Sequence, residues 1–198
     1  MLTSVENIWG GDGNDTLTGD GAKNELRGNN GDDVLVGGAG ADKLTGGAGF
    51  DLADYSASGA ITVSLAAPSI NTGVAAGDMF VSIEGLLGGA GADRFTGNSA
   101  ANRLDGSGGN DTLTGNGGAD DFGYSAGADR ITDFADNTDT LILDRDLWGG
   151  GTRTTAEIVA LAVATGGNTV FDFGGGNVLT VVGLTNANVF LNDVEFML

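Results

Sequence analysis

Apolar positions in the first quarter of the chain recur every nine residues. From Gly10 the sequence reads GGDGNDTLT, GDGAKNELR, GNNGDDVLV, GGAGADKLT and GGAGFDLAD, with an apolar residue at the eighth position of every unit. The first six positions are mostly Gly, Asn and Asp, which tolerate left-handed backbone angles and favour tight turns. The last three positions, with the apolar residue at their centre, have the pattern of a short strand. Each unit therefore predicts one turn followed by one strand.

The nine-residue period returns from Gly88 with the units GGAGADRFT, GNSAANRLD, GSGGNDTLT and GNGGADDFG, and it fades in a degenerate fifth unit that begins at Tyr124. The two arrays match each other at a constant offset, so that Ser4-Val5-Glu6 corresponds to Ser82-Ile83-Glu84. Both second units depart from the pattern in the same way, with Ala at position four and Asn at position six. This shared departure indicates duplication of a whole array.

Two successive units are expected to complete one coil of a solenoid, because a turn and a strand form only half a circuit. The apolar residues of alternate units then face each other across a flat interior. Turns two units apart stack on the same side, where their Asp carboxylates approach closely. Like charges at such distances repel each other unless they are protonated or a cation binds between them. At neutral pH the pattern therefore favours a bound cation.

Composition narrows the candidate chemistry. The chain has 27 acidic and 8 basic residues, a net charge of −19, and neither His nor Cys. These absences exclude a Ser-His-Asp triad, a Cys nucleophile, imidazole-bound zinc, and haem or iron–sulfur sites of the usual kinds. The acidity argues against nucleic acid as a partner, because phosphate recognition needs clustered Lys and Arg. No apolar run reaches the roughly 18 residues of a membrane span. Dense, short carboxylates suggest a hard cation such as Ca²⁺.

The repeated nonapeptide GGxGxDxUx, where U is apolar, resembles that of RTX (hemolysin-type) calcium-binding proteins, and in particular the C-terminal region of a type I secreted exoprotein. The resemblance implies an all-β fold, a parallel β-roll, with roughly six Ca²⁺ ions between stacked turns. In that family one turn provides the carbonyls of positions two and four and the carboxylate of position six. The turn two units later provides the carbonyls of positions one and three and its own carboxylate.

The resemblance implies three sites in each array. In the first array they pair Gly11, Gly13 and Asp15 with Gly28, Asn30 and Asp33; Asn29, Gly31 and Asp33 with Gly46, Ala48 and Asp51; and Asp20, Ala22 and Asn24 with Gly37, Ala39 and Asp42. In the second they pair Gly89, Gly91 and Asp93 with Gly106, Gly108 and Asp111; Asn98, Ala100 and Asn102 with Gly115, Gly117 and Asp120; and Ser107, Gly109 and Asp111 with Tyr124, Ala126 and Asp129. We expect weaker binding at Asn24 and Asn102, where an amide replaces a carboxylate.

The period divides the chain into four segments. Residues 1–54 and 82–135 are the two arrays, 55–81 an irregular solenoid linker, and 136–198 a C-terminal cap. In the linker, residues 61–65 and 78–83 read as strands, with a loop around Pro68–Gly77. Tyr55 and Ser56 have no catalytic base near them in the sequence, and we assign them no catalytic role. After the second array, Asp133, Asp136 and Asp139 form either a further Ca²⁺ site or a solvated acidic turn.

The cap is predicted to be rich in β-structure and to carry one short helix. Thr154 to Glu157 fits a helix capping box, and a helical run from Ile158 to Ala164 would stop at Gly166-Gly167. A hairpin follows, with strands 169–173 and 178–182. The tail, residues 189–198, is similar to the uncleaved signals of proteins exported by type I secretion. The start, Met1 to Glu6, lacks the features of a secretory signal peptide.

These features predict a non-enzymatic calcium-binding module. We expect it to be disordered without Ca²⁺ and to fold on binding Ca²⁺ after leaving the cell through a type I exporter, where it stabilises or displays a larger extracellular protein. The alternative is an extracellular ligand-binding or adhesive module that contacts a polysaccharide or a cell surface, similar to the repeat modules of alginate epimerases or to surface-layer proteins. Only eight basic residues are available to contact an acidic glycan.

Overall fold

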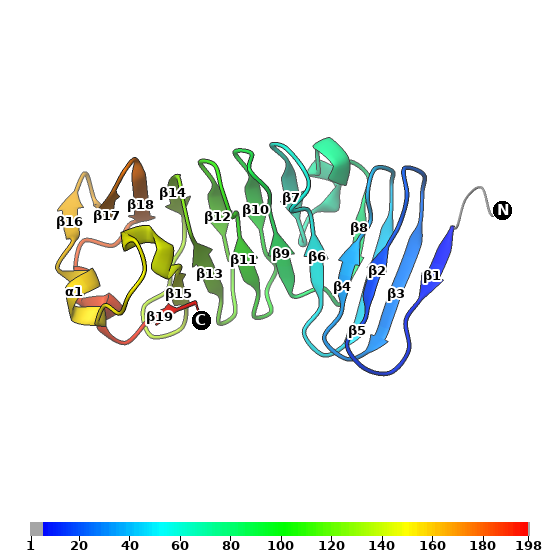
Figure 1. Ribbon diagram of the computed structural model, residues 1–198, viewed down its shortest axis with the longest axis horizontal. Helices are drawn as coiled ribbons and strands as arrows, with labels where there is room; N and C mark the ends of the chain where they lie inside the picture. The colour runs from blue at the N-terminus through cyan, green and yellow to red at the C-terminus, as the bar shows by residue number, and fades with distance from the viewer. Residues whose placement is uncertain (1–5, 198) are drawn as a thin grey trace.

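The fold is an elongated stack of β-coils closed at its C-terminal end by a cap, as the computed structural model shows for residues 6–197 (Figure 1). Met1 to Val5 lie outside the described residues. They include most of the segment on which the signal-peptide prediction rests. They also include the start of the first predicted domain. Leu198, the end of the predicted secretion signal, lies outside them too. The all-β parallel β-roll predicted from the sequence is confirmed.

One layer of the roll is a single parallel sheet of eight strands that runs through both arrays and ends in the cap. We call it the continuous sheet. Successive strands lie one coil apart, so that Leu17 pairs with Leu35, and Leu104 with Phe122. In spatial order its strands are β2 (Thr16–Thr18), β4 (Val34–Val36), β6 (Leu52–Asp54), β9 (Gly85–Leu87), β11 (Arg103–Asp105), β13 (Asp121–Tyr124), β15 (Thr140–Leu143) and β19 (Val194–Phe196).

The opposite layer consists of two sheets, one for each array. The first-array sheet is parallel and contains β1 (Asn7–Trp9), β3 (Glu25–Asn30), β5 (Lys43–Ala48) and β8 (Met79–Val81). The second-array sheet begins with five parallel strands, the last of which is β18, and ends in an antiparallel part that belongs to the cap. Its strands are β7 (Thr62–Ser64), β10 (Arg94–Thr96), β12 (Thr112–Thr114), β14 (Ala128–Ile131), β18 (Asn177–Val182), β17 (Asn168–Gly174) and β16 (Ala162–Thr165).

The core is the narrow space between the two layers, and the eighth residue of each unit fills it. Each of these side chains is buried, and most have no exposed surface. Burying a Leu or Phe side chain stabilises a protein by roughly 1.5–3 kcal/mol, so this thin apolar row is the main apolar contribution of the arrays. The residues are Leu17, Leu26, Leu35, Leu44, Ala53, Phe95, Leu104, Leu113, Phe122 and Ile131.

One enlarged coil joins the two arrays, and we call it the junction coil (residues 55–84). It leaves β6 in the continuous sheet, forms β7 and then β8 in the opposite layer, and returns to β9. Both predicted linker strands are present. The predicted loop holds two 3₁₀ turns, Pro68–Ile70 and Gly73–Ala75. Because β6 pairs directly with β9, the continuous sheet passes the insertion without a break.

The cap contains the predicted helix and hairpin, but its helix is shorter than predicted. The capping box between Thr154 and Glu157 is present, and helix α1 covers only Thr155–Val159. The predicted helical run to Ala164 was wrong, because Ala162–Thr165 is strand β16, antiparallel to β17. Gly166 and Gly167 both have positive φ (58° and 83°), as a tight two-residue hairpin turn requires. This Gly pair therefore makes a hairpin turn and does not end a helix.

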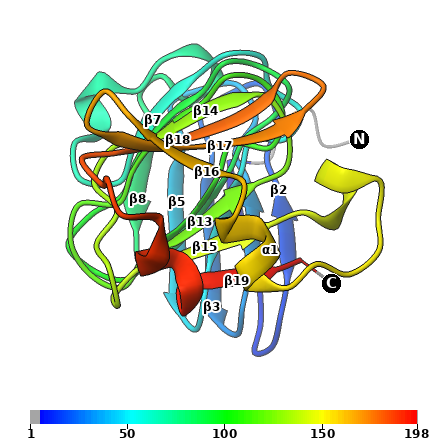
Figure 2. The ribbon, with the colours of Figure 1, turned by 90° about the vertical axis from the view of Figure 1, so that its left-hand side faces the viewer.

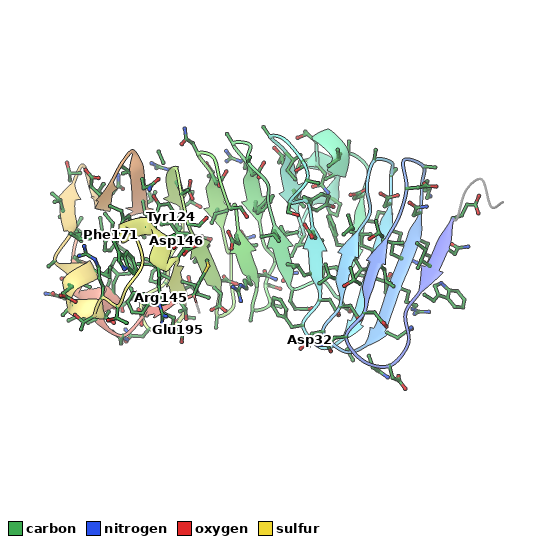
Figure 3. The ribbon with its side chains drawn as sticks, in the orientation of Figure 1. Asp32, Tyr124, Arg145, Asp146, Phe171 and Glu195 are labelled. Carbon is green, nitrogen blue, oxygen red and sulfur yellow. The ribbon has the colours of Figure 1, made fainter. Side chains whose placement is uncertain are left out.

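Aromatic side chains fill the cap, which faces the viewer in Figure 2. Phe171, labelled in Figure 3, packs edge-on against Phe190 with ring centroids 5.2 Å apart, and Phe190 lies 5.0 Å from Phe134. Phe190 belongs to the 3₁₀ turn Ala187–Leu191, within the predicted secretion tail. That tail is therefore folded through Phe196 and helps to cover the open end of the solenoid, which otherwise exposes its core.

Candidate metal centre

The carboxylates at position six form a hydrogen-bonded ladder along the stacked turns. The N–H of Asp15 donates to Oδ1 of Asp33 (2.8 Å), and the N–H of Asp33 donates to Oδ1 of Asp51 (3.0 Å). In each case the donor and the acceptor are 18 residues apart. The same bond joins Asn24 to Asp42, Asp93 to Asp111, Asn102 to Asp120 and Asp111 to Asp129. The structure thus brings together the turns of all six predicted pairs.

One oxygen of several ladder carboxylates is buried and has no hydrogen-bond partner. This is true of Oδ2 in Asp33, Asp42, Asp51 and Asp111, whose residues are at most 1% exposed. A buried acceptor without a partner costs about 1–3 kcal/mol, and more when it is charged. Four such oxygens in equivalent places indicate positions that a ligand is needed to satisfy.

The glycine at position one leaves space beside each of these oxygens. A Cβ at Gly106 would overlap Oδ2 of Asp111, and a Cβ at Gly37 would overlap Oδ2 of Asp42. At Gly88 it would lie 2.8 Å from the carbonyl oxygen of Gly106 in the next turn. A carboxylate oxygen and a carbonyl oxygen of the following turn therefore converge on a space that any larger residue would fill.

Backbone carbonyls of neighbouring turns also face each other. The carbonyl oxygens of Asn29 and Gly31, at positions two and four, lie against Gly47 and Gly49 of the next turn. The carbonyl of Asn30, at position three, points the other way and accepts the N–H of Gly13 at 2.7 Å. The carbonyls of positions two and four thus face one neighbouring turn, and that of position three faces the other. The same contact with a glycine of the following turn is made by the carbonyl oxygens of Asp20, Ala22, Gly91, Ala100 and Gly109.

The donor sets consist of oxygen atoms, most of them from the backbone. Within residues 6–197, no three or more Asp, Glu, His or Cys side chains converge in a way that could hold a metal ion. Each pair of turns instead offers carbonyl oxygens and one or two carboxylates, the hard-oxygen chemistry that Ca²⁺ prefers. The orphaned oxygens and the space beside the glycines fit an ion of this kind.

Burial raises the pKa of these carboxyl groups, because removal from water disfavours their charged form. The pKa is raised to about 6 at Asp42, Asp51 and Asp120, to about 7 at Asp111 and to about 8 at Asp129. Repulsion from neighbouring carboxylates adds to the effect, as from Asp93 on Asp111. Without a cation, the folded turns at Asp111 and Asp129 therefore hold protons near neutral pH.

Four overlapping stretches of the chain, residues 7–22, 18–53, 87–122 and 96–131, match the family described as RTX calcium-binding nonapeptide repeat. The two arrays are RTX calcium-binding repeats. The matched stretches coincide with the stacked turns described above and leave out the junction coil and the cap.

Among solved structures, the extracellular lipase LipA from Serratia marcescens is similar over 99% of this chain, with 17% sequence identity and a TM-score of 0.54. The chain spans 41% of that lipase, and the likeness concerns the fold alone. The AlgE6R3 subunit of the Azotobacter vinelandii mannuronan C5-epimerase is 20% identical over 94% of this chain and 80% of the subunit, with a TM-score of 0.25. No curated protein matches the chain in sequence. Residues 6–197 include no helix that is long and apolar enough to span a membrane.

The two asparagines at position six of the RTX arrays have a structural role of their own. Asn102 accepts the N–H of Asn98 through Oδ1 (2.7 Å) and donates from Nδ2 to the carbonyl of Glu84 (3.3 Å). An aspartate could not make the second bond, because a carboxylate has no donor. Asn24 accepts the N–H of Asp20 in the same way. The shared departure from the RTX pattern is thus explained at Asn102 by the carbonyl in front of it.

The ladder continues beyond the RTX units through residues that the repeat pattern did not identify. Asp78 accepts the N–H of Asp42 (2.8 Å), and Asp139 accepts that of Asp120 (3.0 Å). Each immediately precedes a short strand, as position-six residues do, and this placement is the sequence signal that could have found them. The second oxygen of Asp78 accepts the hydroxyl of Tyr55 at 2.7 Å. Burial and the nearby Asp78 raise the pKa of Tyr55, so the hydroxyl remains a donor.

The three aspartates after the second array do not form a joint site. Asp133 accepts the N–H groups of Gly115 and Asn116 (2.9 and 2.8 Å). Asp139 accepts those of Asp120 and Ala135, whereas Asp136 is exposed. Because each carboxylate has its own place and the three do not converge, the structure favours the acidic turn over a further Ca²⁺ site.

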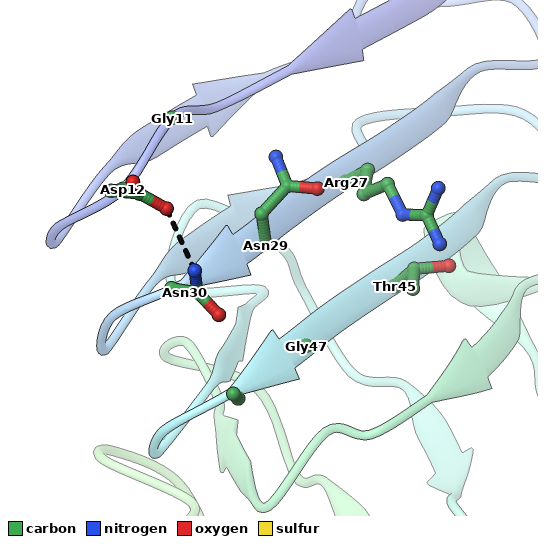
Figure 4. A pocket seen from close by; sticks show the side chains of 8 residues that line it. Gly11, Asp12, Arg27, Asn29, Asn30, Thr45 and Gly47 are labelled. Atoms are coloured by element: carbon green, nitrogen blue, oxygen red, sulfur yellow. Dashed lines mark hydrogen bonds between the residues drawn. The ribbon is translucent and has the colours of Figure 1, made fainter.

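A shallow hollow of about 610 Å³ lies on the outer face of the first-array sheet. Figure 4 shows the Asp12 carboxylate beside the amide of Asn30, with Asn29 and the guanidinium of Arg27 further along the same face. The amide of Asn30 donates to Asp12 at 2.7 Å. The hollow therefore presents amide, carboxylate and guanidinium groups on an open surface.

Proposed function

We propose that this chain is a calcium-controlled folding module that folds on binding Ca²⁺ outside the cell and stabilises or displays a larger extracellular protein. The buried, unpartnered carboxylate oxygens of the RTX turns carry this proposal. The metal-free roll keeps these oxygens desolvated and close to other carboxylates, whereas a bound cation satisfies them and offsets the repulsion.

The charge of the chain links ion binding to folding. With a net charge of −19 and 38 glycines, the unfolded chain repels itself and has much conformational entropy to lose, about 1–2 kcal/mol per ordered residue. Roughly six Ca²⁺ ions, if each is held by the turns of one predicted pair, would cancel about twelve negative charges. Ions that bind only the folded state add stability by mass action.

The difference in calcium concentration between compartments would then act as the switch. Extracellular modules bind Ca²⁺ with dissociation constants of about 10⁻⁴–10⁻³ M, so such sites would be empty in a calcium-poor cytosol and filled outside. An unfolded chain can pass through a type I exporter, and a calcium-bound fold cannot return. We assign the chain no catalytic step.

The assigned sites are tested by isothermal titration of the full chain with Ca²⁺ near neutral pH. We expect roughly six ions from the predicted pairs of turns, with weaker binding at the two pairs that contain Asn24 or Asn102. A stoichiometry below about three ions would contradict most of the assignments.

A second candidate function is binding of an extracellular polysaccharide, and the polar hollow on the first-array sheet favours it. Arg27 supplies a cation for an acidic sugar, and Asn29 and Asp12 can bond hydroxyl groups. Binding of the full chain to an array of polysaccharides, with Ca²⁺ and with EDTA, tests this function. Retention that needs Ca²⁺ and disappears in Arg27→Ala would support it, and no retention of any glycan would exclude it.

A further inference from the structure

The last turn of the first RTX array faces a turn that is not an RTX unit. The residues Ser82, Ile83 and Glu84 connect β8 to β9, whereas six residues connect β2 to β3 or β10 to β11. This short turn belongs to the junction coil and lies outside the stretches that match the RTX family. It stacks directly on the turn formed by residues 46–51, because β6 pairs with β9 and β5 with β8.

The short turn nevertheless places oxygen atoms where an RTX turn places them. The N–H of Asp51 donates to Oε2 of Glu84 (3.0 Å), which continues the ladder of the position-six carboxylates. The carbonyl oxygen of Ser82 lies beside Gly46, where a Cβ would overlap both that oxygen and Oδ2 of Asp51. In the same way, a Cβ on Gly10 would meet the carbonyl oxygen of Gly28.

The buried oxygen of Asp51 points into this space and has no partner. Asp51 has no exposed surface, and its Oδ2 is one of the four orphaned ladder oxygens. The adjoining loop residues Gly47 to Phe50 are exposed, so an ion can enter from solvent. The carbonyl of Ala48 points back to the N–H of Gly31. In the preceding turn the carbonyls of Asn29 and Gly31, at the same two positions, lie against the following turn, and we expect those of Gly47 and Gly49 to face the short turn in the same way.

The shortness of the turn explains why it carries a glutamate. Between Ser82 and β9 there is no room for the six-residue loop that brings an aspartate into place. A side chain with one more methylene can reach the same position from the shorter backbone. Ser82 itself adopts φ of +48°, a left-handed conformation that non-glycine residues seldom adopt.

We propose that the carboxylates of Asp51 and Glu84 and the carbonyls of Gly47, Gly49 and Ser82 form a Ca²⁺ site that joins the two arrays. We call it the seam site. It rests on the proposed calcium-dependent function and adds one ion to those of the six predicted pairs. Because its ligands come from the end of one array and from the coil that leads into the other, the ion couples the folding of the two arrays.

The test compares Glu84→Gln with Glu6→Gln in the full chain. Glutamine keeps the oxygen that accepts the N–H of Asp51 and removes the charge that a cation needs. Glu6 stands at the equivalent place before the first array, and within residues 6–197 no turn is stacked in front of it. Calcium titration by calorimetry and thermal unfolding with Ca²⁺ and with EDTA are measured for both variants and for the wild type.

We expect Glu84→Gln to bind one ion fewer than the wild type and to show a smaller calcium-induced rise in melting temperature, while Glu6→Gln binds as many ions as the wild type. Glu84→Asp, which keeps the charge but not the reach, should also lose one ion. A Glu84→Gln protein that binds as many ions as Glu6→Gln, with the same rise in melting temperature, would overturn the seam site alone. A wild-type protein that binds no Ca²⁺ would overturn the proposed function as well.

Discussion

At the scale of single residues, each position of the RTX unit has a separate physical requirement. Position one must be Gly because its own turn folds a carboxylate onto it, as at Gly106 and Asp111. Position three has no such neighbour, and a Cβ at Gly117 would meet nothing within 4 Å. The sequence reflects this difference, because position three holds Asp, Asn, Ala, Ser or Gly, whereas position one of the first nine units is always Gly.

Two Gly→Ala substitutions in the second array test this requirement. We expect Gly106→Ala to lower the free energy of unfolding by roughly 1–3 kcal/mol, as overpacking typically does, because its Cβ overlaps the Asp111 carboxylate. Gly117→Ala keeps the same backbone carbonyl and should change stability by less than about 0.5 kcal/mol. Urea denaturation in Ca²⁺ measures both, and equal effects would refute the role of position one.

Replacing Asp111, whose Oδ2 has no partner, is expected to have opposite effects on folding with and without calcium. Asp111→Asn removes a charge that burial disfavours, so the metal-free chain should become easier to fold. The substitution also removes a charged ligand of the calcium ion. Bonds to charged groups contribute about 1.5–3 kcal/mol. The calcium concentration for half-maximal folding should therefore rise by roughly tenfold or more.

Asp136→Asn is the matched control for Asp111→Asn, because it makes the same change of charge on an exposed turn. Calcium titrations followed by far-ultraviolet circular dichroism compare the two variants. If both shifted the midpoint equally, net charge and not a particular site would control folding.

At the scale of elements, the two edges of the junction coil differ in the partners of their ladder carboxylates. On the edge of the first-array sheet, the second oxygen of Asp78 accepts the hydroxyl of Tyr55, so this last carboxylate is satisfied, although Oδ2 of Asp42 in the turn before it has no partner. On the edge of the continuous sheet, Oδ2 of Asp51 remains without a partner. A tyrosine hydroxyl thus satisfies the last carboxylate on one edge, and the proposed seam ion would satisfy Asp51 on the other.

Removing the Tyr55 hydroxyl should therefore weaken the fold without removing an ion. Tyr55→Phe leaves a buried carboxylate oxygen of Asp78 unpaired, at a cost of about 1–3 kcal/mol, and the calcium stoichiometry should not change. Tyr124→Phe removes a hydroxyl that donates to the neutral carbonyl of Gly127 and should cost less, about 0.5–1.5 kcal/mol. Chemical denaturation in Ca²⁺ measures both costs. A smaller loss in Tyr55→Phe than in Tyr124→Phe would contradict this role.

The elements that follow a fixed period could be predicted from the sequence, and those outside it only in part. Strands such as Thr16–Thr18 were evident because a nine-residue repeat fixes turn and strand together. The helix predicted to reach Ala164 failed because Ala, Val and Leu also suit a strand when a partner lies beside them. The partner, β17, is reached through a Gly-Gly turn whose positive φ angles the sequence did not reveal.

The candidate metal sites follow the same rule, because only contacts at a fixed period could be predicted from the sequence. The paired turns and position-six carboxylates could be predicted because their partners lie one coil away, at a constant 18 residues. The hydrogen bond of Asp51 to Glu84 spans 33 residues and that of Tyr55 to Asp78 spans 23. No period indicates these separations, because the length of the junction coil sets them.

At the scale of the whole molecule, the raised carboxyl pKa values predict how the metal-free fold depends on pH. Groups such as Asp111 and Asp129, with pKa values raised to about 7 and about 8, bind more protons in the folded than in the unfolded state. The free energy of unfolding therefore falls as pH rises from the ordinary Asp pKa of about 4 towards these values. In EDTA the chain should be most ordered near pH 4–5 and lose structure towards pH 8.

Calcium binding should release protons at about pH 5, where the metal-free chain is still ordered and the same carboxyl groups hold protons that the ion displaces. Calorimetry in buffers of different ionisation enthalpy measures this release. We expect more protons released per ion at about pH 5 than at about pH 8, where the metal-free chain is disordered and its carboxyl groups are already ionised. A heat of binding that is independent of the buffer at both pH values would contradict the proton occupancy of the turns.

The central claim is that calcium binding and folding of this chain are one event. Far-ultraviolet circular dichroism of the full chain near neutral pH, first in EDTA and then with excess Ca²⁺, tests it most directly. We predict the spectrum of a disordered chain in EDTA and a β-sheet spectrum after Ca²⁺ is added, with a return to disorder on chelation. A β-sheet spectrum already present in EDTA and unchanged by Ca²⁺ would contradict the claim.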